Sequence, residues 1–157
     1  MHKLVPIQTV LIPIDFTDSA RQAFYAGISL AAKTGAEVYV LHVSEPIKAF
    51  DFGKKRYVET AETIARVEEG VTRRINELWE GGGVEAVDRR KIHMVVRGGK
   101  AANEILAVAK EKNADLIVLG SSGEGGIGSP LGTTSERVSR EALCSVLTIR
   151  AGKPHRG

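Results

Sequence analysis

Five short apolar segments alternate with helical patterns along the chain, and this order limits the possible folds more than any other feature. The segments are rich in valine and isoleucine and show little polar alternation, which is typical of strands buried on both faces. They cover residues 9–14, 37–43, 92–96, 115–120 and 145–150. Strand–helix alternation predicts right-handed crossovers and a parallel sheet with helices on both faces. The sequence therefore predicts an α/β fold with three layers, α/β/α.

Four helices are predicted between these strands from the spacing of apolar residues. The first follows Asp18 or Ser19, either of which can cap it, and ends at Gly35. The second carries an apolar stripe and stops at the glycine-rich segment 80–83. The stripe consists of Ile64, Val67, Val71, Ile75 and Leu78. The third and fourth helices are expected at about 101–112 and 135–143. Their inward residues should be Ile105, Leu106, Ala109, Val138 and Ala142.

Length and composition suit a single domain. The chain has 157 residues, of which 43% are hydrophobic, so we expect one domain over 1–157 with a flexible tail at 150–157. The net charge of +3 and the short basic clusters indicate solvated faces rather than nucleic-acid binding. No segment approaches the roughly 18 apolar residues of a membrane helix, and the start does not resemble a signal peptide. A cytoplasmic protein without a membrane partner is expected.

Cysteine and histidine usage argues against metal or redox chemistry. The only cysteine, Cys144, cannot form a disulfide within the chain and is expected to be a structural thiol. His42 and His93 lie inside predicted strands and are expected to be satisfied core or edge side chains. None of the four histidines has metal-ligand spacing with acids or with Cys144. No protein metal site is therefore predicted.

Residues 44–56 form a connection that is longer than a crossover needs. The connection contains Phe50 and Phe52 among lysines and aspartate. Two interpretations are open at this point. The segment could be a lid over the ligand edge of the sheet, or a surface loop that tucks both rings into the nearest groove.

Residues 120–136 combine several features of an anion site. They follow the fourth strand and precede a helix, and glycines allow the backbone to approach a ligand closely. Helix N-termini attract anions, and Thr133, Thr134 and Ser135 add hydroxyl groups. Ligands in open parallel sheets bind beyond the carboxyl ends of the strands, where this segment should lie. The segment is neither a Walker A loop, since it has no Gly-Lys-[Ser/Thr], nor a dinucleotide fingerprint. A flexible surface loop is the alternative.

Five stretches together resemble the universal stress protein family over nearly the whole chain. They are "VLIPIDFTDSA", "VLHV", "NADLIVLGSSG", "LGTTSERV" and "CSVLTIR". The resemblance implies a Rossmann-like fold of the adenine nucleotide alpha hydrolase type, with a five-stranded parallel sheet and four helices. The family's ATP-binding branch carries the motif Gly-x2-Gly-x9-Gly-[Ser/Thr]. Gly120, Gly123, Gly132 and Thr133 follow this order, but only eight residues separate Gly123 from Gly132.

The resemblance also implies a set of nucleotide-contacting residues at the ends of the strands. An acid at the position of Asp15 contacts the adenosine part in the family, and the alternative role is a cap for the first helix. Val43 and Leu119 match apolar residues near the base, and a core role is the alternative for both. The full set is Pro13, Ile14, Asp15, Val43, Gly98, Leu119, Gly120, Ser121, Gly123, Gly132, Thr133, Thr134 and Ser135.

The function implied by the resemblance is an ATP-dependent switch or sensor in the stress response. Mg²⁺ could accompany the triphosphate through its oxygens and water. No catalytic residue can be assigned, so any ATPase activity should be very slow. The alternative is a dimeric interaction module of the same fold that binds no nucleotide. In either case a homodimer is expected through the last strand, by Val146, Leu147, Thr148 and Ile149.

Overall fold

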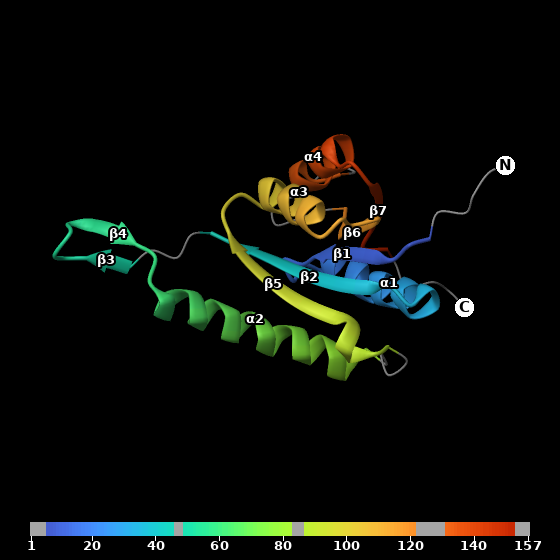
Figure 1. Cartoon of the computed structure of the whole chain (residues 1–157), viewed down its shortest axis with the longest axis horizontal. Helices are drawn as coiled ribbons and strands as arrows, with labels where there is room; N and C mark the ends of the chain where they lie inside the picture. Colours follow the sequence, from blue (N-terminus) through green and yellow to red (C-terminus); the bar gives the residue numbers. More distant parts are fainter. Residues whose placement is uncertain (1–5, 46–48, 83–86, 122–130, 153–157) are drawn as a thin grey trace.

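The computed structural model describes residues 6–45, 49–82, 87–121 and 131–152. Its centre is a five-stranded parallel sheet in the order β5-β2-β1-β6-β7 (Figure 1). The strands are β1 (Thr9–Pro13), β2 (Glu37–Ser44), β5 (Ile92–Gly98), β6 (Leu116–Gly120) and β7 (Ser145–Ile149). The four helices are α1 (Asp18–Thr34), α2 (Ala61–Gly81), α3 (Ala101–Glu111) and α4 (Thr133–Glu141). The predicted α/β class, five parallel strands and four helices are confirmed.

Helices cover both faces of the sheet and make two buried clusters. α1 and α2 lie on one face, and α3 and α4 lie on the other (Figure 1). Along β1, Val10 and Ile12 join the α1 cluster, whereas Leu11 joins the α3 cluster. All three side chains are completely buried. Burial on both faces explains why the strand sequences lack polar alternation.

Side-chain caps fix where the two long helices begin. The Thr17 hydroxyl accepts a hydrogen bond from Ala20 N at 3.4 Å and caps α1, in place of the predicted Asp18 or Ser19. Thr60 and Thr63 form a reciprocal capping box at the start of α2. At the other end of α1, Gly35 adopts a left-handed φ of 69°, a conformation that favours glycine.

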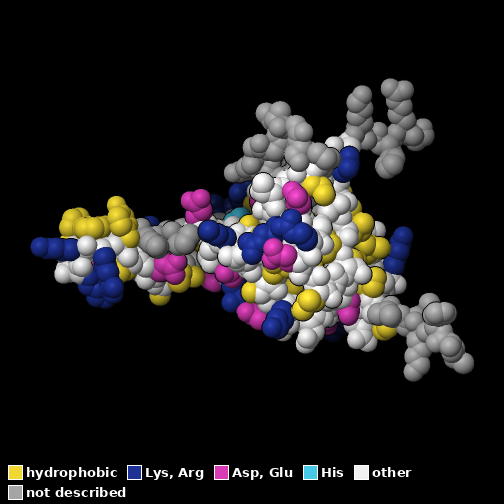
Figure 2. Space-filling view, turned by 90° about the horizontal axis from the view of Figure 1, so that it is seen from above, with side chains coloured by type: hydrophobic (Ala, Val, Ile, Leu, Met, Phe, Trp, Pro, Cys, Tyr) yellow, Lys and Arg dark blue, Asp and Glu magenta, His cyan; other side chains and the backbone are white. Residues whose placement is uncertain are grey.

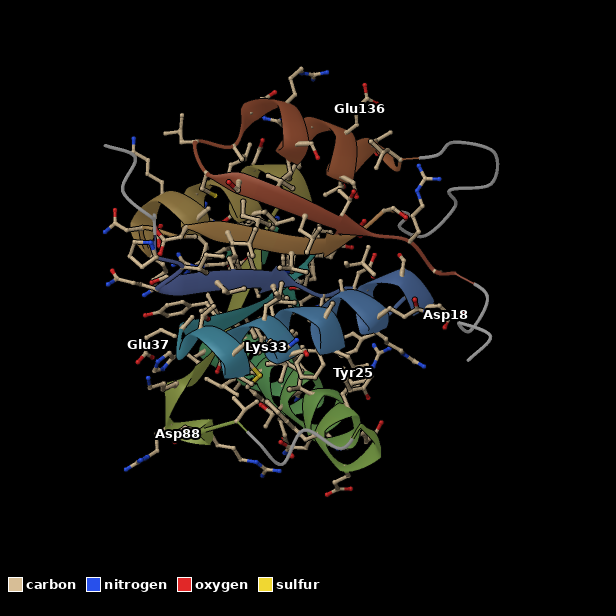
Figure 3. The ribbon with its side chains drawn as sticks, turned by 90° about the vertical axis from the view of Figure 1, so that its right-hand side faces the viewer. Asp18, Tyr25, Lys33, Glu37, Asp88 and Glu136 are labelled. Carbon is tan, nitrogen blue, oxygen red and sulfur yellow. The ribbon has the colours of Figure 1, made fainter. Side chains whose placement is uncertain are left out.

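Aromatic contacts join α1 to α2. The Tyr25 hydroxyl donates to Leu78 O at 2.9 Å, and Figure 3 shows this side chain between the two helices. The neighbouring Phe24 ring meets the Trp79 ring edge to face, with centroids 5.3 Å apart. These contacts hold the second half of α2 on the sheet. The first half differs, because the side chain of Ile64 is 46% exposed although it belongs to the predicted apolar stripe.

The long connection after β2 contains a hairpin that the sequence did not predict. β3 (Ala49–Asp51) and β4 (Arg56–Val58) pair antiparallel and form a separate two-stranded sheet. Figure 1 shows this hairpin projecting away from the body beyond the N-terminus of α2. Phe50 and Phe52 contact each other edge to face rather than a groove of the body. The interpretation as a surface loop with buried rings was therefore wrong.

One side chain joins the start of β1 to the start of β6. The Asp115 carboxylate oxygen Oδ2 accepts hydrogen bonds from Gln8 N at 2.8 Å and Thr9 N at 2.9 Å. β1 thus has β2 on one side and β6, from the last third of the chain, on the other. The direction of the chain through the sheet reverses between β1 and β6, which makes this the switch point.

Candidate functional site

The carboxyl ends of β1, β2, β5 and β6 meet at one edge of the sheet, because these strands are parallel and adjacent. α1 and α4 both begin at this edge, since each follows the end of a strand. In Figure 3 Asp18 and Glu136, in the first turns of these helices, lie toward the same side of the molecule. The edge therefore presents strand ends and helix N-termini together, as ligand sites in open α/β sheets do.

Asp15 lies exposed directly after β1 and is held by the next turn of the chain. Its Oδ1 atom accepts hydrogen bonds from Thr17 N at 3.1 Å and from the Thr17 hydroxyl at 2.5 Å. Oδ2 has no hydrogen bond to any residue that the structure describes. Phe16 between them has a φ of 63°, which is unusual for a residue with a side chain. The arrangement orients one carboxylate oxygen on an exposed residue and leaves the other without a hydrogen bond to the described chain.

The residues before Asp15 are buried. Pro13 and Ile14 are both buried, and Ile14 N donates to Leu41 O at 2.8 Å. The ring of His42 also reaches this point, where Nδ1–H donates to Ile14 O at 2.8 Å. Because a carbonyl can only accept, Nδ1 carries a proton. His42 is thus satisfied, as predicted, but it lies closer to the site than the sequence suggested.

Three side chains in contact, those of Arg74, Phe16 and His42, border the site on the side of α2. The guanidinium of Arg74 lies 3.8 Å from the centroid of the Phe16 ring, a cation–π contact. The Phe16 ring is in turn 5.4 Å from the ring of His42. Arg74 and Phe16 were not predicted as site residues, since their proximity depends on how α2 packs and no local pattern marks it.

At the ends of β2 and β5, the glycine with a positive φ is Gly99 and not the predicted site residue Gly98. Gly99 N donates to Ser44 O at 3.0 Å and joins the two strand ends. Gly99 has a φ of 138°, whereas the predicted Gly98 pairs regularly with Ser44 inside the sheet. Val43, the predicted contact to the base, is half-buried and packs against the α3 cluster.

The end of β6 is packed tightly against the start of α1. A Cβ atom on Gly120 would lie 2.5 Å from Ser19 Oγ and 2.7 Å from Ala20 N. Glycine is therefore required here by the packing of the helix, whatever ligand binds. The preceding Leu119 is buried in the α3 cluster, which agrees with the core interpretation of this residue.

Three hydrogen bonds close the segment between β6 and α4 at its base. Ser121 N donates to Ile149 O at 2.8 Å, and Gly132 N donates to Ser121 O at 2.6 Å. The hydroxyl of Ser135 donates to Gly120 O at 2.6 Å. Ser121 and Ser135 are both buried, and the Ser135 hydroxyl is already engaged by Gly120 O. The predicted Gly123 lies outside the described residues.

The N-terminus of α4 is the part of the edge best suited to an anion. Gly132 is the N-cap, and no side chain caps this helix. Thr133 is exposed and Thr134 is half-buried, and neither hydroxyl has a partner in the described part of the chain. Backbone N–H groups of the first turn and these hydroxyls can bind phosphate oxygens together.

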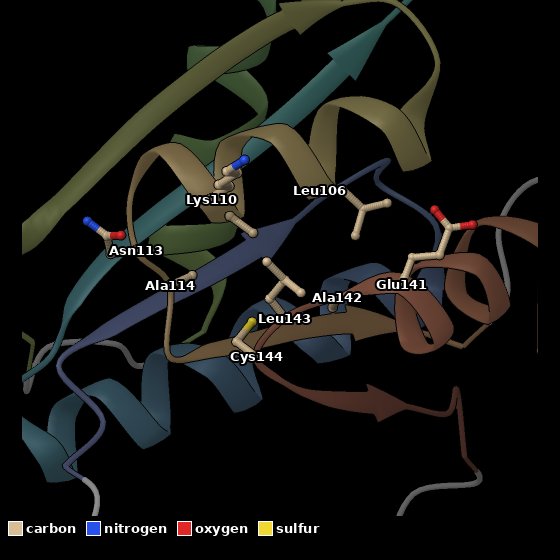
Figure 4. Close-up of a pocket in the computed structure, with 9 residues that line it drawn as sticks. Leu106, Lys110, Asn113, Ala114, Glu141, Ala142, Leu143 and Cys144 are labelled. Carbon is tan, nitrogen blue, oxygen red and sulfur yellow. The ribbon is translucent and has the colours of Figure 1, made fainter.

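A separate pocket lies at the opposite edge of the sheet. It has a volume of about 470 Å³ and lies between the C-terminal ends of α3 and α4 (Figure 4). Leu106, Leu143 and Cys144 are among its lining residues. Burial raises the pKa of the Cys144 thiol, which keeps it protonated and poorly nucleophilic. This pocket is remote from the predicted site and agrees with a structural role for Cys144.

Two other predicted features can be placed. The His93 ring nitrogen Nε2 lies 2.6 Å from Glu37 Oε2, so this histidine has a partner at the sheet edge, as expected. Among the described helices, none combines the length and apolar character that a membrane crossing requires.

The strand order and the ligand edge define a Rossmann-like α/β protein. The chain belongs to the universal stress protein family, whose family model matches residues 6–150. It is 32% identical over 154 residues to a universal stress protein of Methanocaldococcus jannaschii, covering 92% of this chain and 82% of that protein. It is also 32% identical over 150 residues to a universal stress protein of Thermus aquaticus, covering 91% and 98%.

Solved structures agree on the fold. The universal stress protein UspA from Lactobacillus plantarum superposes with a TM-score of 0.70 at 21% identity, covering 94% of this chain and all of that one. A universal stress protein in complex with cAMP gives 0.67 at 23% identity over the same shares. The universal stress protein from Archaeoglobus fulgidus in complex with dAMP gives 0.57 at 20% identity, covering 92% and 99%.

Proposed function

We propose that this protein binds an adenine nucleotide, with ATP as the expected ligand, at the edge formed by β1, β2, β5, β6 and α4. The observation that carries the proposal is that the uncapped N-terminus of α4 and Asp15 both lie at the carboxyl edge of the sheet, after the two strands that flank its switch point. The N-terminus of α4 offers an anion site, and Asp15 offers a carboxylate that can accept hydrogen bonds. A nucleotide has a group of matching chemistry at each end.

Each part of the nucleotide has a chemically suitable partner. Oδ2 of Asp15 can accept a hydrogen bond from a ribose hydroxyl or from the adenine amino group. Apolar atoms of the half-buried Val43 can contact the base. The first-turn N–H groups of α4 and the Thr133 hydroxyl can bind phosphate. Mg²⁺, if it accompanies ATP, would be held mainly by phosphate oxygens and water.

Two neighbouring structures support the choice of an adenine nucleotide, because their proteins were solved with cAMP and dAMP. The motif Gly120, Gly123, Gly132 and Thr133 supports a triphosphate, although its central spacing is one residue shorter than in the ATP-binding branch. We propose that bound nucleotide orders the segment between β6 and α4 and so acts as a switch for partners. This role needs no rapid hydrolysis.

Equilibrium titration with a fluorescent ATP analogue tests the proposal. Asp15→Ala should weaken binding at least about tenfold, because a charged group that loses its hydrogen bond changes affinity by roughly 1.5–3 kcal/mol. Asp18→Ala, three residues away and also exposed, is the matched control and should change binding little. Gly123→Val should abolish binding. If the wild-type protein binds no nucleotide at near-millimolar concentration, the interaction-module alternative replaces this proposal.

We also propose a homodimer through β7. β7 is the last strand of the sheet, and its outer edge has no pairing strand among the described residues. Leu147 on it is 37% exposed. Pairing of two β7 strands would satisfy the open backbone groups and cover this side chain. The substitution Leu147→Pro should abolish such pairing, as measured by light scattering after size exclusion.

A further inference from the structure

The β3–β4 hairpin is the least supported part of the described chain. Its two strands have three residues each, and neither buried cluster includes any of its side chains. A two-stranded hairpin alone is only marginally stable in water. Its aromatic rings contact one another, with the Phe50 centroid 5.1 Å from Phe52 and 5.2 Å from Tyr57. The hairpin is thus a small aromatic cluster without a core behind it.

Most of this aromatic cluster faces solvent. The exposed fractions are 42% for Phe50, 84% for Phe52 and 65% for Tyr57. In Figure 2 hydrophobic side chains gather along one side of the projecting arm, and basic side chains lie at its end and opposite side. Contiguous exposed rings of this kind usually mark an interaction surface.

The charge of the hairpin restricts the partner. Lys54, Lys55 and Arg56 are consecutive and exposed, and no described residue forms an ion pair with them. Asp51 is the only acid in the hairpin, and its Oδ1 accepts from Lys54 N at 3.0 Å. A partner should therefore offer apolar atoms for the rings and acidic groups for the turn.

The first half of α2 has both properties. Val71 and Ile75 of its apolar stripe are buried, but Val67 is only half-buried and Ile64 is exposed. Four exposed glutamates lie in this part of the chain, and Arg66, paired with Glu62 at 2.6 Å, is the only basic residue among them. The glutamates are Glu59, Glu62, Glu68 and Glu69. At 100° per residue Glu68 flanks the stripe, whereas Glu62 and Glu69 lie on the far side of the helix. The segment thus combines an exposed apolar line with a net negative charge, opposite in sign to the charge of the hairpin.

We infer that the hairpin of one copy binds the first half of α2 of a second copy, and that the second hairpin binds the first copy reciprocally. Within one copy the hairpin points away from α2 (Figure 1), so its own helix is not the partner. Phe52 and Tyr57 would cover Ile64 and Val67, and Lys54 and Lys55 would approach Glu68, which flanks these two residues. Such a reciprocal contact closes as a two-fold dimer.

A negatively charged membrane is the main rival partner, because aromatic and basic side chains also bind lipid surfaces. The glutamates of α2 follow the hairpin directly and would repel that surface. A second copy accounts for the exposed stripe and the glutamates as well as for the hairpin. The contact lies at the β5 side of the sheet, which α2 covers, so it does not compete with pairing through β7.

Molar mass in solution tests this contact independently of nucleotide binding and of β7. Phe52→Ser with Tyr57→Ser should halve the mass of the wild-type assembly, with an unchanged circular dichroism spectrum. Arg21→Glu with Lys33→Glu, exposed charges on α1, form the matched control and should leave the mass unchanged.

Exchange of charges identifies the partner surface. Lys54→Glu with Lys55→Glu should halve the mass, and so should Glu68→Lys. Mixing the two variant proteins should restore the full mass, because each reversed hairpin then meets a reversed helix. An unchanged mass in the Phe52/Tyr57 variant overturns the inference, and so does a failure of the mixture to reassociate. A third outcome would assign the hairpin to membranes instead. In that case the wild type sediments with phosphatidylserine vesicles, the Phe52/Tyr57 variant does not, and the molar mass of the variant is unchanged.

Discussion

Two neighbouring strands, β1 and β2, leave the same edge of the sheet by very different connections. Residues 14–17 join β1 to α1, and almost every group in them is used: Ile14 and Phe16 are buried, and Asp15 and Thr17 bond to each other. Residues 45–60 join β2 to α2 and carry their rings outside the body. The short connection is determined by the fold, whereas the long one is free to serve contacts that the fold does not need.

The largest test of this contrast compares two phenylalanines. Phe24→Ala should lower the free energy of unfolding by about 3–5 kcal/mol, because its ring is completely buried between α1, α2 and the sheet. Phe52→Ala should change it by less than about 0.5 kcal/mol at low protein concentration. Urea unfolding measures both. If Phe52 is covered in an assembly, its effect should grow with protein concentration and that of Phe24 should not.

A smaller loss of stability is expected from a substitution at the end of β6, which packs against the start of α1. Gly120→Ala should cost about 1–3 kcal/mol, since the new Cβ would meet backbone atoms of Ser19 and Ala20 that cannot move aside. The control is Gly70→Ala in α2, where nothing lies within 4 Å. That change should stabilise the protein by up to about 1 kcal/mol because alanine favours the helix. Equal effects of the two substitutions would contradict the packing described for Gly120.

The N-caps of α1 and α2 allow a direct comparison of the two connections, because loss of either cap should lower the free energy of unfolding by about 1 kcal/mol. Thr17→Ala and Thr60→Ala both remove a side-chain acceptor from the start of a helix. Only Thr17→Ala also releases Asp15, so only this variant should weaken ATP-analogue binding. Thermal unfolding and the binding titration, performed on the same samples, separate the two roles. Weaker binding in both variants would point to a general loss of structure.

The smallest effect is expected at Asp88, which belongs to neither connection. Hydrogen bonds from Arg90 lower the pKa of the Asp88 carboxyl below 3.8. Because the pKa is lower in the folded state than in the unfolded chain, the ionised carboxylate stabilises the fold at pH values above the unfolded pKa. This stabilisation is lost as the pH falls through the folded-state pKa. Asp88→Asn should therefore reduce stability slightly at pH 7, and the reduction should disappear as the pH falls through the lowered pKa. High salt should remove the difference, because the group is fully exposed.

The sheet and its helices could be predicted because all five strands are short apolar segments, with the central β1 and β6 buried on both faces, and each helix has a stripe of core residues. The hairpin could not, because its strands have three residues and their rings face solvent, which leaves no periodic pattern. The opposite holds for Ile64, which was predicted to be a core residue but is 46% exposed. Its spacing fits the stripe, but the helix extends beyond the body that would cover it.

At the candidate site, topology predicted the positions better than the roles. Parallel strands bring Asp15, Val43 and Gly120 to one edge whatever their side chains do. The hydrogen bond of Ser135 to Gly120 and the left-handed backbone of Gly99 depend on how separate segments meet, so no local pattern marks them. The contacts of Phe16 with His42 and Arg74 were missed for the same reason.

The tie between Asp115 and the backbone of Gln8 and Thr9 has a consequence for synthesis on the ribosome. β1 emerges early and finds β2 soon afterward, but its other neighbour arrives only when Asp115 appears, 107 positions after Gln8. Until then, β1 is a strand of mainly apolar residues with one open edge. We expect the nascent chain to hold a half-sheet of β5, β2 and β1 that any chaperone binding extended apolar segments can recognise. Its release should coincide with the emergence of β6.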